Sequence, residues 1–302
     1  MESNVLAPAI RRIVNLGDSV PWGQGLAEAD KYDALVQKAL GPAVTLQRLA
    51  HSGAIIGLTP VNGPARDGEV PVPQPTILQQ CAAFNDSPAN VDLVLVDGGI
   101  NDVDVRTILN PLVPAGVLSA KTQAACHDAM LVLLRNVAAK FTAPQCRIIV
   151  TGYYPIISGQ SDVLSIPAFL GLHGIALPAF LEDDVAIGGV ISHCQQFFIE
   201  STAFLRQAVT AAADARIVYV DSGFTDANSV FAPEALLWGL QSDVDLSPVD
   251  EVAPQRHAAC DVAFDLLQTL EREQCYRASA GHPNPAGARQ FAKQILAAIG
   301  AA

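Results

Sequence analysis

A serine near the N-terminus occupies a position that suits a nucleophile. Ser19 closes the segment Ile13–Ser19, in which a short apolar run fit for a buried strand ends in Gly-Asp-Ser, and a helical pattern follows over Gly25–Leu40. A serine at such a strand-to-helix corner lies at the carboxyl edge of an open α/β sheet, where ligands bind. The N-terminal N–H groups of the following helix favour negative charge at that corner. Taken alone, however, Gly-Asp-Ser is more typical of an ordinary turn or of a helix N-cap.

Three further short motifs follow predicted elements. His51-Ser52-Gly53 comes after the second predicted strand, the segment Asp97–Asp102 comes after the third, and Gly281–Asn284 stands near the C-terminus. Together with Gly-Asp-Ser, they make the chain resemble the SGNH (GDSL-type) family of esterases and lipases. The family's marks are a serine, a glycine, an asparagine and a histidine in that order, and the resemblance spans residues 13–290. The marks map onto Ser19, Gly53, Asn101 and His282.

The resemblance implies a serine esterase or lipase that hydrolyses carboxylic esters through an acyl-enzyme. Ser19 is then the nucleophile, and His282 is the base that takes its proton. The backbone N–H groups of Ser19 and Gly53 and the side-chain amide of Asn101 form the oxyanion hole. Glycine at position 53 allows the backbone to approach closely. No cofactor is expected, because serine-ester chemistry needs none.

One position departs from the family pattern. The family commonly has an aspartate three residues before the histidine, where its carboxylate orients the imidazole, and this chain has Ser279 there. A backbone carbonyl in the loop Cys275–Gly281 could accept the imidazole N–H instead, which would give a Ser-His dyad. The Ser279 hydroxyl could also accept it, and Asp221 or Asp226 after the fifth predicted strand could supply a carboxylate. We favour the carbonyl and keep the other two alternatives open.

The remaining polar residues near the motifs are expected to have structural roles. Asp18 and Asp102 stand beside motif residues, and both residue types commonly cap or brace turns. The other histidines lack a motif context and are also expected to be structural; they are His51, His127, His173, His193 and His257. The sequence has no G-x-S-x-G motif, which argues against an ordinary α/β-hydrolase.

Apolar runs alternate with helix-like segments along the chain, which predicts an α/β protein with helices on both faces of a parallel sheet. The resemblance implies a three-layer α/β/α sandwich with a central five-stranded, flavodoxin-like sheet. The predicted strands are Arg12–Leu16, Ala43–Leu49, Leu93–Val96, Arg147–Thr151 and Arg216–Val220. The predicted helices are Gly25–Leu40, Ala120–Phe141, Gly189–Ala213, Pro254–Glu273 and Pro285–Ile299.

Length and composition bound the class of protein. The chain has 302 residues, of which 50% are hydrophobic, so it can bury a substantial core, and we treat residues 1–302 as a single domain. The net charge of −12 argues against nucleic-acid partners. The six cysteines form no C-x-x-C pair, so no metal site is expected. Disulfides and buried free thiols both stay open, with Cys260 and Cys275 bracketing a helix-like stretch.

An insertion at about Tyr153–Gly189 interrupts the alternating pattern. It contains the uncharged run Val163–Leu181, which is long enough to suggest a membrane span. Its prolines and glycines, and its position between two sheet strands, argue against stable membrane insertion. We interpret it as an apolar flap beside the ester site, or as a loop subdomain that only packs on the core. No secretory signal pattern opens the sequence, and the compartment stays open between cytoplasmic and secreted after processing.

Two hypotheses from different classes remain after these exclusions. The first is an ester hydrolase for small-molecule substrates, with an acyl or aryl group that the apolar insertion could hold. The second is a non-catalytic ligand-binding protein on the SGNH scaffold, in which Ser279 marks a decayed site. The presence of all four marks argues against decay.

Overall fold

The computed structural model describes residues 10–177, 182–241 and 247–301. Its centre is a sheet of five parallel strands in the order β2-β1-β3-β4-β5. The strands are β1 (Arg12–Leu16), β2 (Thr45–Arg48), β3 (Leu93–Val96), β4 (Arg147–Thr151) and β5 (Ile217–Val220). This is the flavodoxin-like order, so the predicted fold class is confirmed.

The burial of the strands follows their sequences. All four residues of β3 are buried, as expected for the central strand of a sheet that is covered on both faces. The edge strand β2 alternates between exposed and half-buried residues, and its sequence contains Gln47 and Arg48. β1, β3 and β4 have the predicted limits, whereas β2 and β5 are shorter than predicted.

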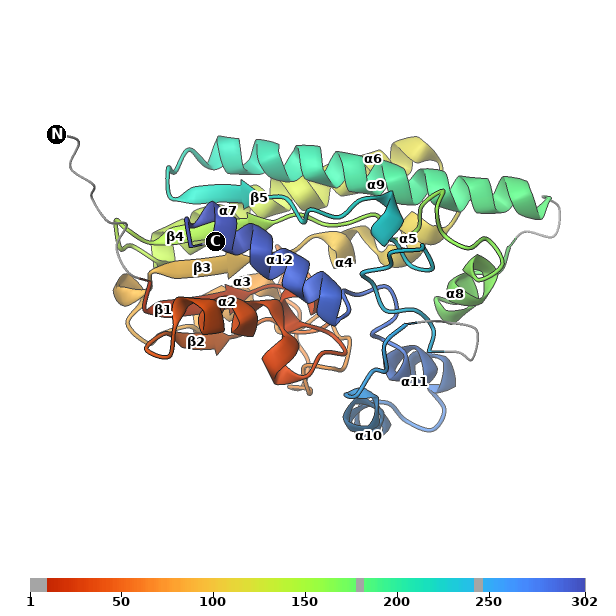
Figure 1. The fold of residues 1–302 in the computed structure, drawn as a ribbon, viewed down its shortest axis with the longest axis horizontal. Coiled ribbons are helices and arrows are strands. Elements are labelled where there is room, and N and C mark those ends of the chain that lie inside the picture. The colour runs from red at the N-terminus through yellow and green to blue at the C-terminus, as the bar shows by residue number, and fades with distance from the viewer. Residues whose placement is uncertain (1–9, 178–181, 242–246, 302) are drawn as a thin grey trace.

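Helices cover both faces of the sheet (Figure 1). On one face α12 (Pro285–Ala298) packs against α2 (Tyr32–Leu40) and β5. On the other face α7 (Met130–Lys140) packs between α3 (Ile77–Ala83) and α9 (Asp183–Ala212). These helices and the sheet form the three layers that the sequence predicts.

Short elements surround this frame. Before α7, α6 (Ala115–Gln123) continues through the π-helical turn η3 (Ala124–Ala129), so this helical run starts earlier than the predicted Ala120. The other short helices are α1 (Ser19–Trp22), α4 (Ile100–Val103), α5 (Val105–Leu109) and α8 (Ile166–Leu172), and the 3-10 turns are η1 (Glu28–Asp30), η2 (Pro88–Asn90) and η4 (Asp226–Asn228). The predicted helix over Gly25–Leu40 begins only at Tyr32, so α1 is the helix that follows the Gly-Asp-Ser corner.

The predicted helix Pro254–Glu273 is wrong as a single element. The chain forms two helices there, α10 (Ala253–Ala263) and α11 (Thr269–Tyr276), and Phe264 between them is extended. A disulfide joins Cys260 to Cys275 across this hairpin, with a Cα–Cα distance of 5.9 Å over a sequence separation of 15. In one straight helix the two Cα atoms would be about 22 Å apart, too far for a disulfide.

The other four cysteines are free thiols. The sequence left disulfides and buried free thiols as alternatives, and the protein has both. Cys81, Cys126, Cys146 and Cys194 are all buried. Burial raises the pKa of each of these thiols, which keeps them protonated and unreactive.

The insertion Tyr153–Gly189 contains α8 and the first turns of α9. Residues 178–181 of its apolar run lie outside the described residues. Among the described residues, no helix is both long and apolar enough to cross a membrane. In Figure 1, α8 lies near the α10–α11 hairpin, at the end of the molecule that holds the carboxyl ends of the strands.

Candidate active site

Ser19 lies directly after β1 because the chain turns sharply at Gly17. Gly17 has a φ of +150°, and a Cβ there would lie 2.4 Å from Pro21 Cγ and 2.9 Å from the Asp97 carbonyl oxygen, so a side chain does not fit. Asp18 caps the next helix by accepting a 2.9 Å hydrogen bond from the Val20 N–H. α1 therefore begins at Ser19. The Ser19 N–H lies in the first turn of the helix, where backbone N–H groups have no acceptor within the helix.

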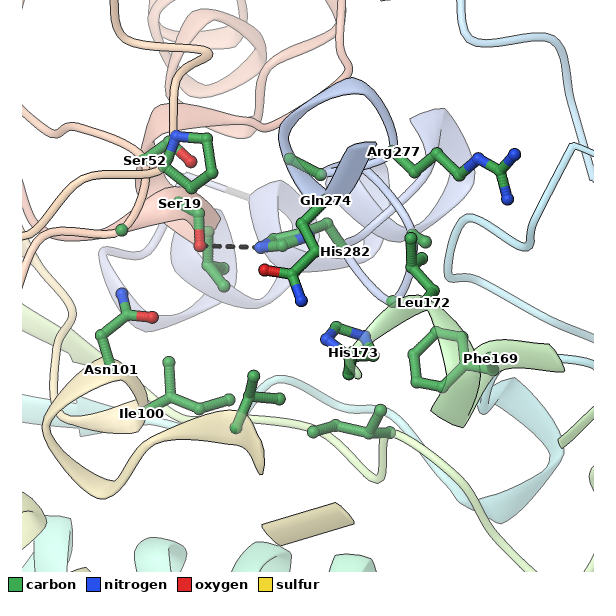
Figure 2. Close-up of a pocket in the computed structure, with 18 of the residues that line it drawn as sticks. Ser19, Ser52, Ile100, Asn101, Phe169, Leu172, His173, Gln274, Arg277 and His282 are labelled. Atoms are coloured by element: carbon green, nitrogen blue, oxygen red, sulfur yellow. Dashed lines mark hydrogen bonds between the residues drawn. The ribbon is translucent and has the colours of Figure 1, made fainter. Parts of the chain in front are cut away.

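His282 reaches the same point from the C-terminal end of the chain. It stands just before α12, whose N-cap is Asn284. The Gly281 N–H donates to the Trp238 carbonyl at 2.9 Å, and the Trp238 N–H donates to the His282 carbonyl at 2.7 Å, so two backbone hydrogen bonds hold this turn. The Nε2 of His282 lies 2.7 Å from the Ser19 hydroxyl oxygen, within hydrogen-bonding distance (Figure 2).

The imidazole of His282 is held in its neutral form. Burial lowers its pKa from 6.5 to about 4, and the backbone of Ser279, Ala280 and Ala278 opposes this shift. Among the described residues, no group has hydrogen-bond geometry with Nδ1, although these backbone groups are close enough to affect the pKa.

The other two candidates for orienting His282 are engaged elsewhere. The Ser279 hydroxyl accepts a 3.4 Å hydrogen bond from Arg256. The Asp221 carboxylate accepts from the Gly223 N–H at 2.9 Å and faces Arg206 at 3.6 Å. Neither Asp221 nor Asp226 is among the residues that line the cavity at Ser19.

Gly53 and Asn101 line this cavity together with Ser19 and His282. Gly53 has a φ of +77°, and a Cβ there would lie 2.5 Å from the Val72 nitrogen, so both the conformation and the close approach require glycine. Asn101 is in α4, and its Nδ2 donates to the Ala54 carbonyl at 3.0 Å. This bond fixes the amide and leaves its second N–H for another acceptor. The structure thus brings all four sequence-predicted residues to one cavity.

Acidic side chains brace the loops around the site, as predicted for Asp18, which is buried, and Asp102, which is half-buried. Asp102 accepts from the Ile56 N–H at 3.0 Å. The Tyr153 hydroxyl donates to Asp18 at 3.0 Å and accepts from the Ile100 N–H at 3.0 Å, so it joins the serine turn to the Asn101 helix. Burial raises the pKa of Asp18 to about 6, and nearby Asp97 likewise has a pKa well above its ordinary value because it is buried.

The cavity beyond Ser19 has a volume of about 190 Å³ and a largely apolar wall. α8 contributes Phe169 and Leu172 to that wall, and α11 contributes Gln274. His173, which the sequence placed among the structural histidines, also lines the cavity, and its ring centroid lies 4.9 Å from that of Phe169. Figure 2 shows His173 and Phe169 on the side of His282 away from Ser19.

His173 is a site residue that sequence reasoning missed. Burial lowers its pKa to about 4, and its Nε2 has no hydrogen-bond partner among the described residues. No motif surrounds it, and the only available signal was its position in the apolar insertion. It offers a neutral polar group in an apolar cavity.

Metal chemistry has no candidate site among the described residues. No group of three or more histidine, cysteine, aspartate or glutamate side chains is arranged to hold an ion there. The residues that line the cavity offer a hydroxyl, an imidazole and hydrogen-bond donors. Both the fold and the order of the four residues match the SGNH pattern.

Several solved structures are similar to this chain. A putative arylesterase from Agrobacterium tumefaciens str. C58 is 13% identical, with 96% of this chain and 98% of that chain covered and a TM-score of 0.45. A catalytic mutant of an acetylxylan esterase from Geobacillus stearothermophilus is 16% identical, with 96% and 94% covered and a TM-score of 0.44. An aryl esterase from M. smegmatis is 16% identical, with 72% and 93% covered and a TM-score of 0.39.

No family model matches the chain, and no curated protein matches it.

Proposed function

We propose that the protein is a serine ester hydrolase of the SGNH type, with Ser19 as nucleophile and His282 as general base. The observation that supports this most strongly is the 2.7 Å distance between the Ser19 hydroxyl oxygen and His282 Nε2, two atoms from opposite ends of the chain. Such a contact in a cavity is the arrangement that activates a serine. The low pKa of His282 keeps the imidazole able to accept a proton.

In the proposed reaction, the Ser19 oxygen attacks the ester carbonyl while its proton passes to His282 Nε2. The tetrahedral oxyanion accepts hydrogen bonds from the N–H groups of Ser19 and Gly53 and from the Asn101 amide. The C–O bond to the alcohol then breaks, and His282 returns the proton to the leaving alkoxide. Water, deprotonated by His282, attacks the acyl-enzyme, and the acid leaves as Ser19 recovers its proton.

We propose that a backbone carbonyl of the turn before His282, not a carboxylate, orients the imidazole. Burial lowers the pKa of His282 and the backbone of residues 278–280 opposes this shift, and the Ser279 carbonyl accepts the His282 N–H at 2.9 Å, so this turn lies against the histidine. An acceptor at Nδ1 fixes the tautomer in which Nε2 is free to take a proton from Ser19. This Ser-His dyad agrees with Ser279 standing where the resembled family has an aspartate.

The cavity favours esters with a small apolar acyl or aryl group. Its volume of about 190 Å³ suits such a group, and α8 of the insertion forms part of its wall. The insertion would then act as an apolar flap for the substrate, as one of the two interpretations of the sequence predicts.

The test is hydrolysis of a chromogenic short-chain ester, p-nitrophenyl acetate or butyrate, by the wild type and by Ser19→Ala. The proposal expects turnover by the wild type and a loss of at least about 10³-fold in Ser19→Ala. Equal slow turnover by both proteins, when circular dichroism shows that both are folded, would contradict the proposal and favour the ligand-binding alternative.

A further inference from the structure

A buried arginine lies behind the turn that carries His282. Arg256 is in α10, and only 1% of its surface is exposed. Its guanidinium donates to Glu69 at 3.1 Å and to Asp250 at 2.5 Å, and both carboxylates are also buried. Its Nε donates to the Tyr276 carbonyl at 3.0 Å. One side chain thus joins the start of its own helix to Tyr276 and to Glu69, which is 187 residues away in the sequence.

Arg256 also contacts the position where the resembled family has its aspartate. It donates to the Ser279 hydroxyl at 3.4 Å. The Ser279 carbonyl in turn accepts the His282 N–H at 2.9 Å, so Arg256 holds the same short turn that presents the imidazole. The side chain at position 279 therefore binds Arg256 in this protein.

Glu69 carries the connection onward to the helix of the nucleophile. Its carboxylate accepts from the Trp22 indole N–H at 2.9 Å and from the Gln24 amide at 2.8 Å. Trp22 is the last residue of α1, which begins at Ser19. The two halves of the site also touch directly, since a Cβ on Gly25 would lie 2.6 Å from the Ser279 Cβ.

We propose that the buried cluster Glu69–Arg256–Asp250 sets the distance between Ser19 and His282 in this chain. Arg256 of this cluster binds position 279, where the resembled family has an aspartate. The inference rests on the proposed function and deepens it. Glu69 fixes the end of α1, and Arg256 fixes the histidine turn through Tyr276 and Ser279. All three are positioning residues, because they act through these neighbours and do not line the reacting atoms.

The Cys260–Cys275 disulfide supports the same assembly. Cys260 is one turn after Arg256 on α10, and Cys275 immediately precedes Tyr276, whose carbonyl Arg256 binds. The disulfide therefore ties the helix that carries Arg256 to the end of α11 just before the histidine turn. A one-ångström shift of a reacting group typically costs about 10²-fold in rate, so this tie has a measurable consequence.

A second buried ion pair provides a matched control. Arg48 binds Asp33 at 2.6 Å, and Asp33 is fully buried. Like Glu69, Asp33 accepts a hydrogen bond from a neighbouring side-chain amide, that of Asn15 at 2.7 Å. Its partners Asn15 and Arg48 lie in β1 and β2, and among the described residues neither hydrogen-bonds the histidine turn; Asn15 also donates to the Pro21 carbonyl of α1 at 2.9 Å. Loss of this pair should lower stability without moving His282.

The first test compares Glu69→Gln with Asp33→Asn. We expect both variants to lose thermal stability, and Glu69→Gln to lose kcat for the chromogenic ester by about tenfold to 10²-fold, with KM within about twofold. Histidine-selective ¹⁵N NMR should show the His282 imidazole signals displaced in Glu69→Gln and unchanged in Asp33→Asn. A Glu69→Gln protein with wild-type kcat and wild-type His282 signals would overturn the proposal.

A second test applies even if Glu69→Gln does not fold. Ser279→Asp restores the family residue but adds a third carboxylate beside Arg256, so we expect a lower kcat. The double variant Ser279→Asp/Asp250→Asn keeps two carboxylates on Arg256 and should recover most of the lost kcat. A higher kcat in Ser279→Asp alone, or a loss that the double variant does not recover, contradicts the proposal.

The two proposals fail separately. If the wild type shows no turnover that depends on Ser19, the proposed function fails, and the NMR comparison of Glu69→Gln with Asp33→Asn still decides the positioning role. If that turnover is present and Glu69→Gln leaves both kcat and the His282 signals unchanged, only the positioning role fails.

Discussion

The sheet edge and the C-terminal turn position their halves of the site in different ways. Ser19, Gly53 and Asn101 follow β1, β2 and β3, which are neighbours in the sheet. The backbone register of three parallel strands therefore brings these residues to one edge whatever side chains the strands carry. His282 follows a helical hairpin, and its turn is held by two backbone hydrogen bonds to Trp238, by side-chain contacts and by the disulfide of the hairpin.

This difference between the sheet edge and the histidine turn indicates which substitutions should lower activity. A sheet distributes its constraints over many backbone hydrogen bonds, whereas the histidine turn has a few backbone hydrogen bonds and depends also on buried side chains. Substitutions outside the cavity should therefore disturb the histidine half more than the serine half. The following predictions test this contrast, from the largest expected effect to the smallest.

Removing the imidazole should have the largest effect, because both halves must meet for the serine to be activated. We expect His282→Ala to lower kcat by about 10⁴- to 10⁶-fold, comparable to losing a serine–histidine pair in other hydrolases. Steady-state kinetics with the chromogenic ester measures this. A kcat within tenfold of the wild type would mean that His282 is not the base.

Removing the amide at the sheet edge should have the next largest effect. Asn101→Ala deletes one oxyanion donor and should lower kcat by about 10²- to 10³-fold with little change in KM. Asn136→Ala is the matched control, since the one side-chain hydrogen bond of Asn136 among the described residues lies within its own helix, to the Val132 carbonyl at 2.8 Å. If Asn101→Ala and Asn136→Ala have equal kcat values, Asn101 is not part of the oxyanion hole.

The pH dependence of activity should report the buried state of His282. The pKa of His282 is lowered to about 4, and the neutral imidazole is the base. Activity should therefore be retained above pH 4 and be lost as the pH falls through about 4. The acid limb of kcat/KM against pH measures this. A limb near the ordinary histidine pKa of 6.5 would show that His282 is not desolvated in the free enzyme.

Breaking the hairpin disulfide should affect stability more than rate. For a separation of 15 residues, the chain-entropy model gives a loss of about 3 kcal/mol in the free energy of unfolding for Cys260→Ser/Cys275→Ser. Because α11 leads into the histidine turn, we also expect a fall in kcat of about threefold to tenfold. Denaturant unfolding and steady-state kinetics measure the two effects. An unchanged kcat would mean that the hairpin does not help to position His282.

The smallest effect should follow from the carboxylates that the sequence left open. Asp221→Asn and Asp226→Asn should each keep kcat within about twofold, because neither residue lines the cavity. Ser279→Ala should also retain an active Ser-His pair, with a kcat above that of Ser279→Asp, because it adds no charge beside Arg256. A large loss of kcat in Asp221→Asn or Asp226→Asn would mean that this carboxylate, and not a backbone carbonyl, orients the His282 imidazole.

The sequence predicted the sheet half of the molecule well, for a physical reason. β3 and β4 are short apolar runs whose local pattern differs clearly from the helices between them, and the residues after parallel strands meet at one edge. Ser19, Gly53 and Asn101 were therefore located by local patterns and by the resemblance.

The positioning of His282 could not be predicted in the same way. Glu69 and Arg256 are 187 residues apart, and nothing in their local sequence indicates that they are buried together. The helical pattern over Pro254–Glu273 is nearly continuous, so the break after α10 was missed. His173 was assigned a structural role because a histidine in an apolar run carries no local sign of facing a cavity.

The account depends most directly on Ser19 becoming acylated. Wild-type protein is mixed with p-nitrophenyl acetate, quenched in acid within the turnover time, digested and analysed by mass spectrometry, with Ser19→Ala treated in parallel. The account predicts one acetyl group on the peptide that contains Ser19 and none in Ser19→Ala. Turnover by the wild type without that adduct, or an adduct on another residue in both proteins, would contradict it.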